Sequence, residues 1–71
     1  MEGYITLEEK VEEILDLWRE ETGYIDEEIS NVRALYVDRE FDIYTISFRC
    51  GNTTYIVKSI PTKNGPTLID V

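Results

Sequence analysis

The sequence predicts an α+β domain in which one N-terminal amphipathic helix packs on an antiparallel sheet of three or four strands. Apolar residues recur at three- and four-residue steps within residues 7–21, which indicates a helix with one buried face. Segments 42–49 and 53–60 alternate between polar and apolar residues and are rich in β-branched residues, which indicates strands. At 71 residues, the chain is expected to form a single domain, 1–71.

The helix has clear start and stop signals. Thr6 is a suitable N-cap and Glu9 follows at the capping-box spacing. Gly23 after Thr22 is a suitable left-handed C-cap. The residues expected to face the core are Leu7, Val11, Ile14, Leu15 and Trp18.

Gly51-Asn52 between the two alternating segments predicts a two-residue hairpin turn, with glycine where positive φ is needed. This turn fixes the pairing of the two strands. The expected pairs are Cys50 with Thr53, Phe48 with Tyr55 and Ile46 with Val57, and, on the other face, Ile43 with Ile60. Residues 61–66 are expected to form a loop, and Thr67 to Val71 a short last strand.

The middle of the chain, residues 24–37, is compatible with two structures. We expect a short helical turn at 26–30 and then a strand over 32–37, because residues 32–37 are rich in β-formers. The alternative is a second full helix, which would give two helices followed by a three-stranded meander. In the strand version the expected pairs are Tyr36 with Tyr44, Ala34 with Ile46 and Val32 with Phe48.

One helix cannot cover both faces of this sheet. The uncovered face would expose aliphatic side chains, which indicates a dimer or partner surface unless the register differs or segment 24–37 wraps over it. The residues of this possible dimer face are Leu35, Val37, Ile43, Ile56 and Ile60.

The chain has a net charge of −8, and the negative charge is confined to its first half. Residues 1–31 hold eleven acids and two bases, whereas residues 32–71 hold four acids and five bases. Direct binding to nucleic acid is therefore disfavoured, and a basic protein partner is favoured. No stretch is long and apolar enough to span a membrane, so the default expectation is a soluble protein of the cytoplasm.

Acidic residues at four-residue spacing on the outer side of the helix repel one another and weaken the helix. This face is either a solvated surface that keeps the protein soluble or a binding surface for a basic partner. The candidate partner-binding residues are Glu8, Glu9, Glu12, Glu13, Asp16, Glu20, Glu27 and Glu28.

Catalytic and metal-binding motifs are missing from the sequence. The chain has no histidine, and its single cysteine, Cys50, has no base to activate it. The acids Asp38, Glu40 and Asp42 have the spacing that opens a calcium loop, but the glycine and glutamate that such a loop requires are replaced by Ile43 and Arg49. We therefore expect no cofactor, no metal and no enzymatic activity.

Two resemblances follow from these patterns. The order helix, Gly23, strand, Tyr44-x-Ile46-x-Phe48, Gly51, Tyr55-x-Val57, Gly65 and Leu68 resembles PepSY-type domains. That resemblance implies one helix on an antiparallel meander and a regulatory, non-catalytic binding role. In size and charge alone, segment 8–28 is similar to small viral inhibitors of host defence, such as anti-CRISPR and anti-restriction DNA mimics. That second resemblance implies an inhibitor acting in the host cytoplasm on a basic nucleic-acid-handling protein.

Overall fold

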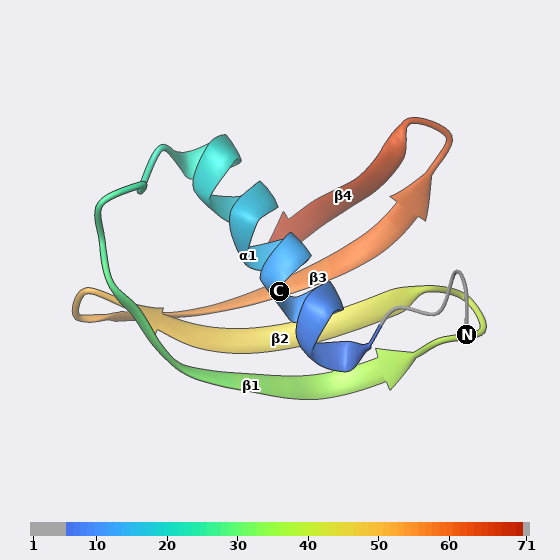
Figure 1. Ribbon diagram of the computed structural model, residues 1–71, viewed down its shortest axis with the longest axis horizontal. Helices are drawn as coiled ribbons and strands as arrows, with labels where there is room; N and C mark the ends of the chain where they lie inside the picture. Colours follow the sequence, from blue (N-terminus) through green and yellow to red (C-terminus); the bar gives the residue numbers. More distant parts are fainter. Residues whose placement is uncertain (1–5, 71) are drawn as a thin grey trace.

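The computed structural model describes residues 6–70 and has one helix lying on one face of a four-stranded antiparallel sheet (Figure 1). The elements are α1 (Leu7–Thr22), β1 (Ile29–Asp38), β2 (Ile43–Cys50), β3 (Thr53–Thr62) and β4 (Gly65–Asp70). The strands are ordered β1-β2-β3-β4, so consecutive strands pair and β1 and β4 form the two edges. The predicted α+β class is confirmed, and the version with two helices is wrong.

Helix α1 begins and ends where its capping residues predict. The Glu9 backbone N–H donates to Thr6 Oγ1 at 3.1 Å, and the Thr6 N–H donates to the Glu9 carboxylate at 3.0 Å. At the other end Gly23 has φ 81°, and its N–H donates to the Arg19 carbonyl at 2.8 Å. These bonds satisfy backbone groups that a helix end leaves unpaired.

The core lies between the inner side of α1 and the centre of the sheet. Ile14 and Trp18 are buried on the helix, as are Ile46, Phe48 and Val57 on β2 and β3. The ring of Trp18 meets that of Phe48 edge-on, with the ring centroids 4.8 Å apart. Burial of these groups supplies the main stabilisation of a domain this small.

The β2–β3 hairpin has the predicted register. Cys50 pairs with Thr53, Phe48 with Tyr55 and Ile46 with Val57. Gly51 has φ 63°, as expected for the first central residue of a tight hairpin turn.

The prediction of a helical turn at 26–30 is wrong. Residues 23–28 form an irregular connection, and β1 is already extended at Ile29. Ile29 pairs with Cys50 and packs against the core, which requires an extended backbone. The Arg19 guanidinium holds the connection by donating to the Ile25 carbonyl at 2.9 Å.

Two irregularities in β1 also overturn part of its predicted register. The pairing with β2 shifts between Ser30 and Arg33 and again between Ala34 and Tyr36. Each shift places one extra residue on β1, as in a β-bulge. Ala34 pairs with Ile46 as predicted, but Tyr36 pairs with Thr45 instead of Tyr44.

The second shift exchanges the faces of two side chains. Because Val37 pairs with the buried Tyr44, it belongs to the helix-covered face. Tyr36, which pairs with Thr45, belongs to the opposite face. Directly paired residues of an antiparallel ladder share a face, so Val37 was wrongly placed on the uncovered face and Tyr36 on the covered one.

The predicted loop at 61–66 is wrong, because β3 and β4 continue through most of it. Thr62 pairs with Gly65, so only Lys63 and Asn64 form the turn. The last strand thus begins at Gly65, two residues before the predicted start at Thr67, and the predicted end at Val71 lies outside the described residues.

Candidate protein-binding surfaces

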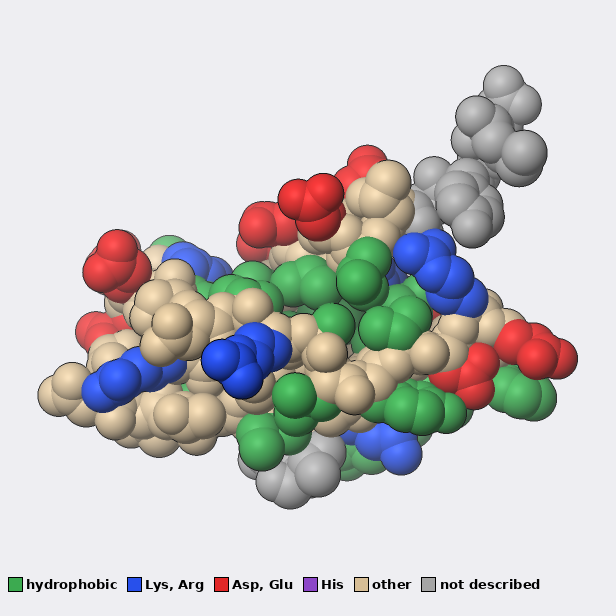
Figure 2. All heavy atoms as spheres, turned by 90° about the horizontal axis from the view of Figure 1, so that it is seen from below, with side chains coloured by type: hydrophobic (Ala, Val, Ile, Leu, Met, Phe, Trp, Pro, Cys, Tyr) green, Lys and Arg blue, Asp and Glu red, His purple; other side chains and the backbone are tan. Residues whose placement is uncertain are grey.

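The outer side of α1 carries a row of exposed carboxylates. Glu8, Glu12, Asp16 and Glu20 follow one another at four-residue steps and are all exposed. At a rise of 1.5 Å per residue this row is about 18 Å long. In Figure 2 acidic side chains stand on the helix above a band of hydrophobic side chains.

Both bases of α1 are directed away from this row of carboxylates. Lys10 is only 5% exposed, and its ammonium group lies 3.2 Å from Glu13, 3.5 Å from Asp42 and 5.3 Å from the centroid of the Tyr44 ring. Arg19 donates to the Ile25 carbonyl. Within residues 6–70, no ion pair therefore neutralises the row.

The electrostatics of Lys10 fit this inward position. Burial alone would lower the pKa of the Lys10 ammonium, but Glu13 and Asp42 outweigh burial and raise that pKa above its ordinary value. The side chain therefore stays charged where it is buried, since its charge is paired.

The other predicted acids of the helix have structural partners. Glu9 is part of the capping box, and its hydrogen bonds from Thr6 lower the pKa of its carboxyl group. Glu13 is the ion-pair partner of Lys10. These two carboxylates are exposed but already engaged, so of the predicted helix acids the row of four is left available to a partner.

The two remaining predicted acids, Glu27 and Glu28, do not extend the helix row. They lie on the connection between α1 and β1. One Glu27 carboxylate oxygen would lie 3.1 Å from a Cβ added at Gly51, so Glu27 sits beside the β2–β3 turn. The predicted acidic surface is thus two separate groups.

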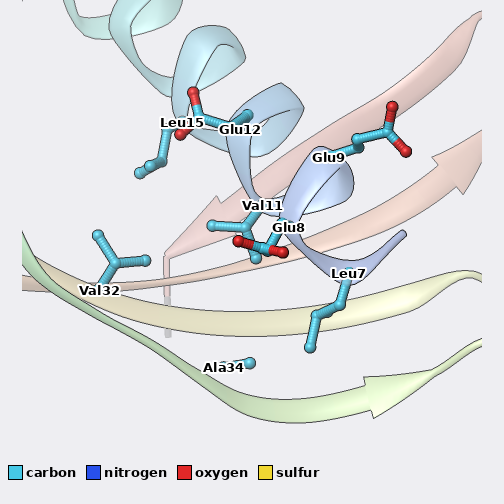
Figure 3. Close-up of a pocket in the computed structure, with 8 residues that line it drawn as sticks. All are labelled: Leu7, Glu8, Glu9, Val11, Glu12, Leu15, Val32 and Ala34. Atoms are coloured by element: carbon cyan, nitrogen blue, oxygen red, sulfur yellow. The ribbon is translucent and has the colours of Figure 1, made fainter. Parts of the chain in front are cut away.

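An apolar groove between α1 and β1 was not predicted. It has a volume of about 520 Å³. In Figure 3 the side chains of Leu7, Val11 and Leu15 point from the helix toward Val32 and Ala34 of β1, with Glu8 and Glu12 at the helix rim and Glu9 directed away. The sequence signal was present, because these three helix residues lie on the β1 side of the predicted stripe. What could not be read from it was that β1 would leave Leu7 and Val11 partly uncovered, while Leu15 is buried.

The sheet face opposite α1 exposes a mixed surface. Of the predicted dimer-face residues, Ile43, Ile56 and Ile60 lie on this face by register, and Leu35 is 53% exposed beside the second bulge. Val37 does not belong to this face, because it pairs with the buried Tyr44. The register adds Tyr36 and Ile69 to it, together with three bases, Arg33, Arg49 and Lys58.

Two of the three acids considered for calcium, Asp38 and Asp42, have other roles. The Asp38 carboxylate accepts hydrogen bonds from the N–H groups of Glu40 and Phe41 and so shapes the β1–β2 turn. Asp42 pairs with Lys10. Among residues 6–70, no cluster of three or more metal-ligating side chains is found, and no helix is long and apolar enough to cross a membrane.

Comparisons of this chain with protein-family models, with curated proteins and with solved structures found no match.

Proposed function

We propose that this chain is a non-enzymatic protein-binding module that engages a basic partner through the outer face of α1. The observation that supports it most is the placement of Lys10 and Arg19. A helix selected only for stability would set its bases among its acids, because like charges four residues apart destabilise it. Here both bases are directed to the core side or the C-terminal connection, and no base among residues 6–70 forms an ion pair with the row of four carboxylates.

The form of partner that suits this row is a protein whose Lys and Arg side chains normally hold nucleic acid. Nucleic acid offers such proteins a regular series of negative charges, and most of its binding energy comes from contacts to them. A rigid helix that presents carboxylates at each turn competes for the same bases. The chain would then act as a nucleic-acid-mimicking inhibitor, of the kind that anti-defence proteins of viruses use.

Charge reversal on the helix tests this proposal. The triple variant Glu12→Lys, Asp16→Lys, Glu20→Lys reverses three of the four charges of the row but leaves Glu8, Glu13 and the capping box in place. The control, Asp26→Lys with Glu40→Lys, reverses two exposed acids that lie off the helix and outside the predicted binding set. An arginine-rich peptide is titrated into each protein at about 50 and about 300 mM salt, a range over which surface charges become strongly screened.

The proposal expects salt-dependent binding by the wild type and the control, and its loss in the triple variant. Equal binding by all three proteins would exclude the helix row as the site.

A second candidate function is supported by the uncovered sheet face. Tyr36, Ile56 and Ile69 are each at least 38% exposed there, and Leu35 at the second bulge is 53% exposed; exposed apolar side chains of this size favour an interface. On this account the chain is a homodimeric or PepSY-like regulatory domain. Sedimentation equilibrium distinguishes it, because a dimer that Ile56→Glu converts to a monomer would favour the sheet face over the helix.

A further inference from the structure

The single helix leaves half of the sheet's inner face open. Strands lie about 4.8 Å apart, so four strands make a sheet about 19 Å wide, whereas one helix is only about 10 Å across. Figure 1 shows that α1 crosses the sheet diagonally and diverges from β1 along its length. Part of the uncovered area is the groove between α1 and β1.

The groove is apolar on both walls and acidic along one rim. Val11 and Leu15 form the helix wall, and Val32, which is 39% exposed, and Ala34 form the strand wall. Glu8 and Glu12, two members of the carboxylate row, stand along the helix rim. An occupant of complementary chemistry therefore has apolar side chains flanked by bases.

The backbone of β1 favours a helical occupant over an added strand. An edge strand can pair with an incoming strand only where its free N–H and C=O groups are regularly spaced. Two bulges interrupt this spacing in β1, and Asn31, which lies within the first of them, has φ 52°. The helix wall from Leu7 to Leu15 is about 12 Å long, which corresponds to about two turns of an occupying helix.

We propose that this groove is the seat of a basic amphipathic helix of the partner, which lies beside α1 and completes a two-helix layer over the sheet. This inference rests on the proposed function, because the acidic rim selects the same basic partner. It adds that recognition is not purely electrostatic, and that two or three apolar residues of the partner's helix are buried against Val11, Leu15 and Val32.

The variant Ala34→Glu distinguishes apolar binding in the groove from binding by charge alone. The added carboxylate would strengthen purely electrostatic binding of a basic peptide, but it occupies the groove and weakens insertion of apolar side chains. Ile56→Glu adds the same charge to the opposite face of the sheet and is the matched control, as Ile56 is 38% exposed. Val32→Thr, which keeps the β-branched shape, is a second and milder groove variant.

The probes are two synthetic peptides of identical composition. In one, leucines recur at helical three- and four-residue steps and lysine and arginine flank them; in the other the order is scrambled. Calorimetry gives the affinities at low and high salt, and circular dichroism checks that each variant folds.

The proposal expects the amphipathic peptide to bind at least about tenfold more tightly than the scrambled one, which corresponds to burial of one further apolar side chain. It also expects this advantage to disappear in Ala34→Glu, to fall in Val32→Thr and to persist in Ile56→Glu.

Other results would refute the groove proposal and would show separately whether the proposed function holds. Equal, salt-dependent binding of both peptides with no loss in Ala34→Glu would refute the groove and retain the acidic face. Absence of binding by either peptide would refute both. If the chain alone formed a dimer that Ala34→Glu dissociates, the occupant would be a second copy and the proposed partner would be wrong.

Discussion

Lys10 and Asp42 form an ion pair that joins the first turns of α1 to the β1–β2 turn, with the ammonium nitrogen 3.5 Å from a carboxylate oxygen. The lysine stem is buried and its ammonium group lies over the ring of Tyr44. The same pairing withdraws the nearest base from the carboxylate row. One contact thus fixes the helix on the sheet and leaves the outer face of the helix acidic.

Loss of this pair should lower stability at neutral and mildly alkaline pH and should have less effect at high pH. Because the folded-state pKa of Lys10 is raised above its ordinary 10.5, its contribution is fully present below that pH and is lost as pH rises through the folded-state pKa. Lys10→Met keeps the apolar stem and should cost about 1 kcal/mol or less at pH 8, since both acids remain half-exposed.

Urea unfolding between pH 8 and 11.5 measures this contribution. The difference in unfolding free energy between wild type and Lys10→Met should shrink toward the alkaline end, while Lys63→Met controls for the loss of one positive charge. A difference that stays constant with pH would show that the ion pair does not stabilise the fold.

The capping box should stabilise the start of α1. Thr6→Ala should lower the unfolding free energy by about 1 kcal/mol, a typical cost of losing an N-cap. The hydrogen bonds from Thr6 lower the pKa of Glu9, so the contribution of its carboxylate is present above the ordinary value of 4.5 and is lost as pH falls. Thermal unfolding of Glu9→Gln should therefore differ from wild type at pH 7 and converge with it near pH 3.

Ser59 is a buried polar group whose removal should stabilise the protein. Its side chain is 1% exposed, and its hydroxyl oxygen has no hydrogen-bond partner within the described residues. An unpaired buried hydroxyl costs about 1 kcal/mol or more. Ser59→Ala should thus raise the denaturant midpoint, whereas Ser47→Ala on the opposite face should leave it unchanged; a lower midpoint for Ser59→Ala would mean that the hydroxyl is bonded.

Gly51 should tolerate substitution poorly for two reasons. Its φ of 63° costs about 1 kcal/mol or more for a residue with a side chain, and an added Cβ would lie 3.1 Å from the Glu27 carboxylate. Gly51→Ala should therefore destabilise the hairpin, and Asn52→Ala, in the same turn, should not. If Glu27→Ala restored full stability to Gly51→Ala, contact rather than backbone conformation would be the dominant cost.

The parts of the fold that depend on local signals could be predicted from the sequence. Thr6, Glu9 and Gly23 specify the helix ends, and Gly51 specifies the central hairpin. The register of β1 could not be predicted, since alternation does not reveal where a strand bulges. The extra residues near Asn31 and Leu35 reflect the fit of β1 to the twisted sheet.

The candidate site could also be predicted only where it depends on local spacing. Helical spacing alone places Glu8, Glu12, Asp16 and Glu20 on one face. Lysine is almost never buried unless it is paired. Asp42, which pairs with Lys10 from the β1–β2 turn, is distant in the sequence, so the inward position of Lys10 could not be predicted. The groove depends on how α1 crosses β1, which no periodicity encodes.

Chemical-shift mapping tests the central claim most directly. The isotopically labelled chain is titrated with an arginine-rich peptide, and the shift of each backbone amide is followed. The account predicts that the largest changes occur along α1 at Glu8, Glu12, Asp16 and Glu20. Changes centred on Tyr36, Ile56 and Ile69 of the sheet, or no change at saturating peptide, would contradict it.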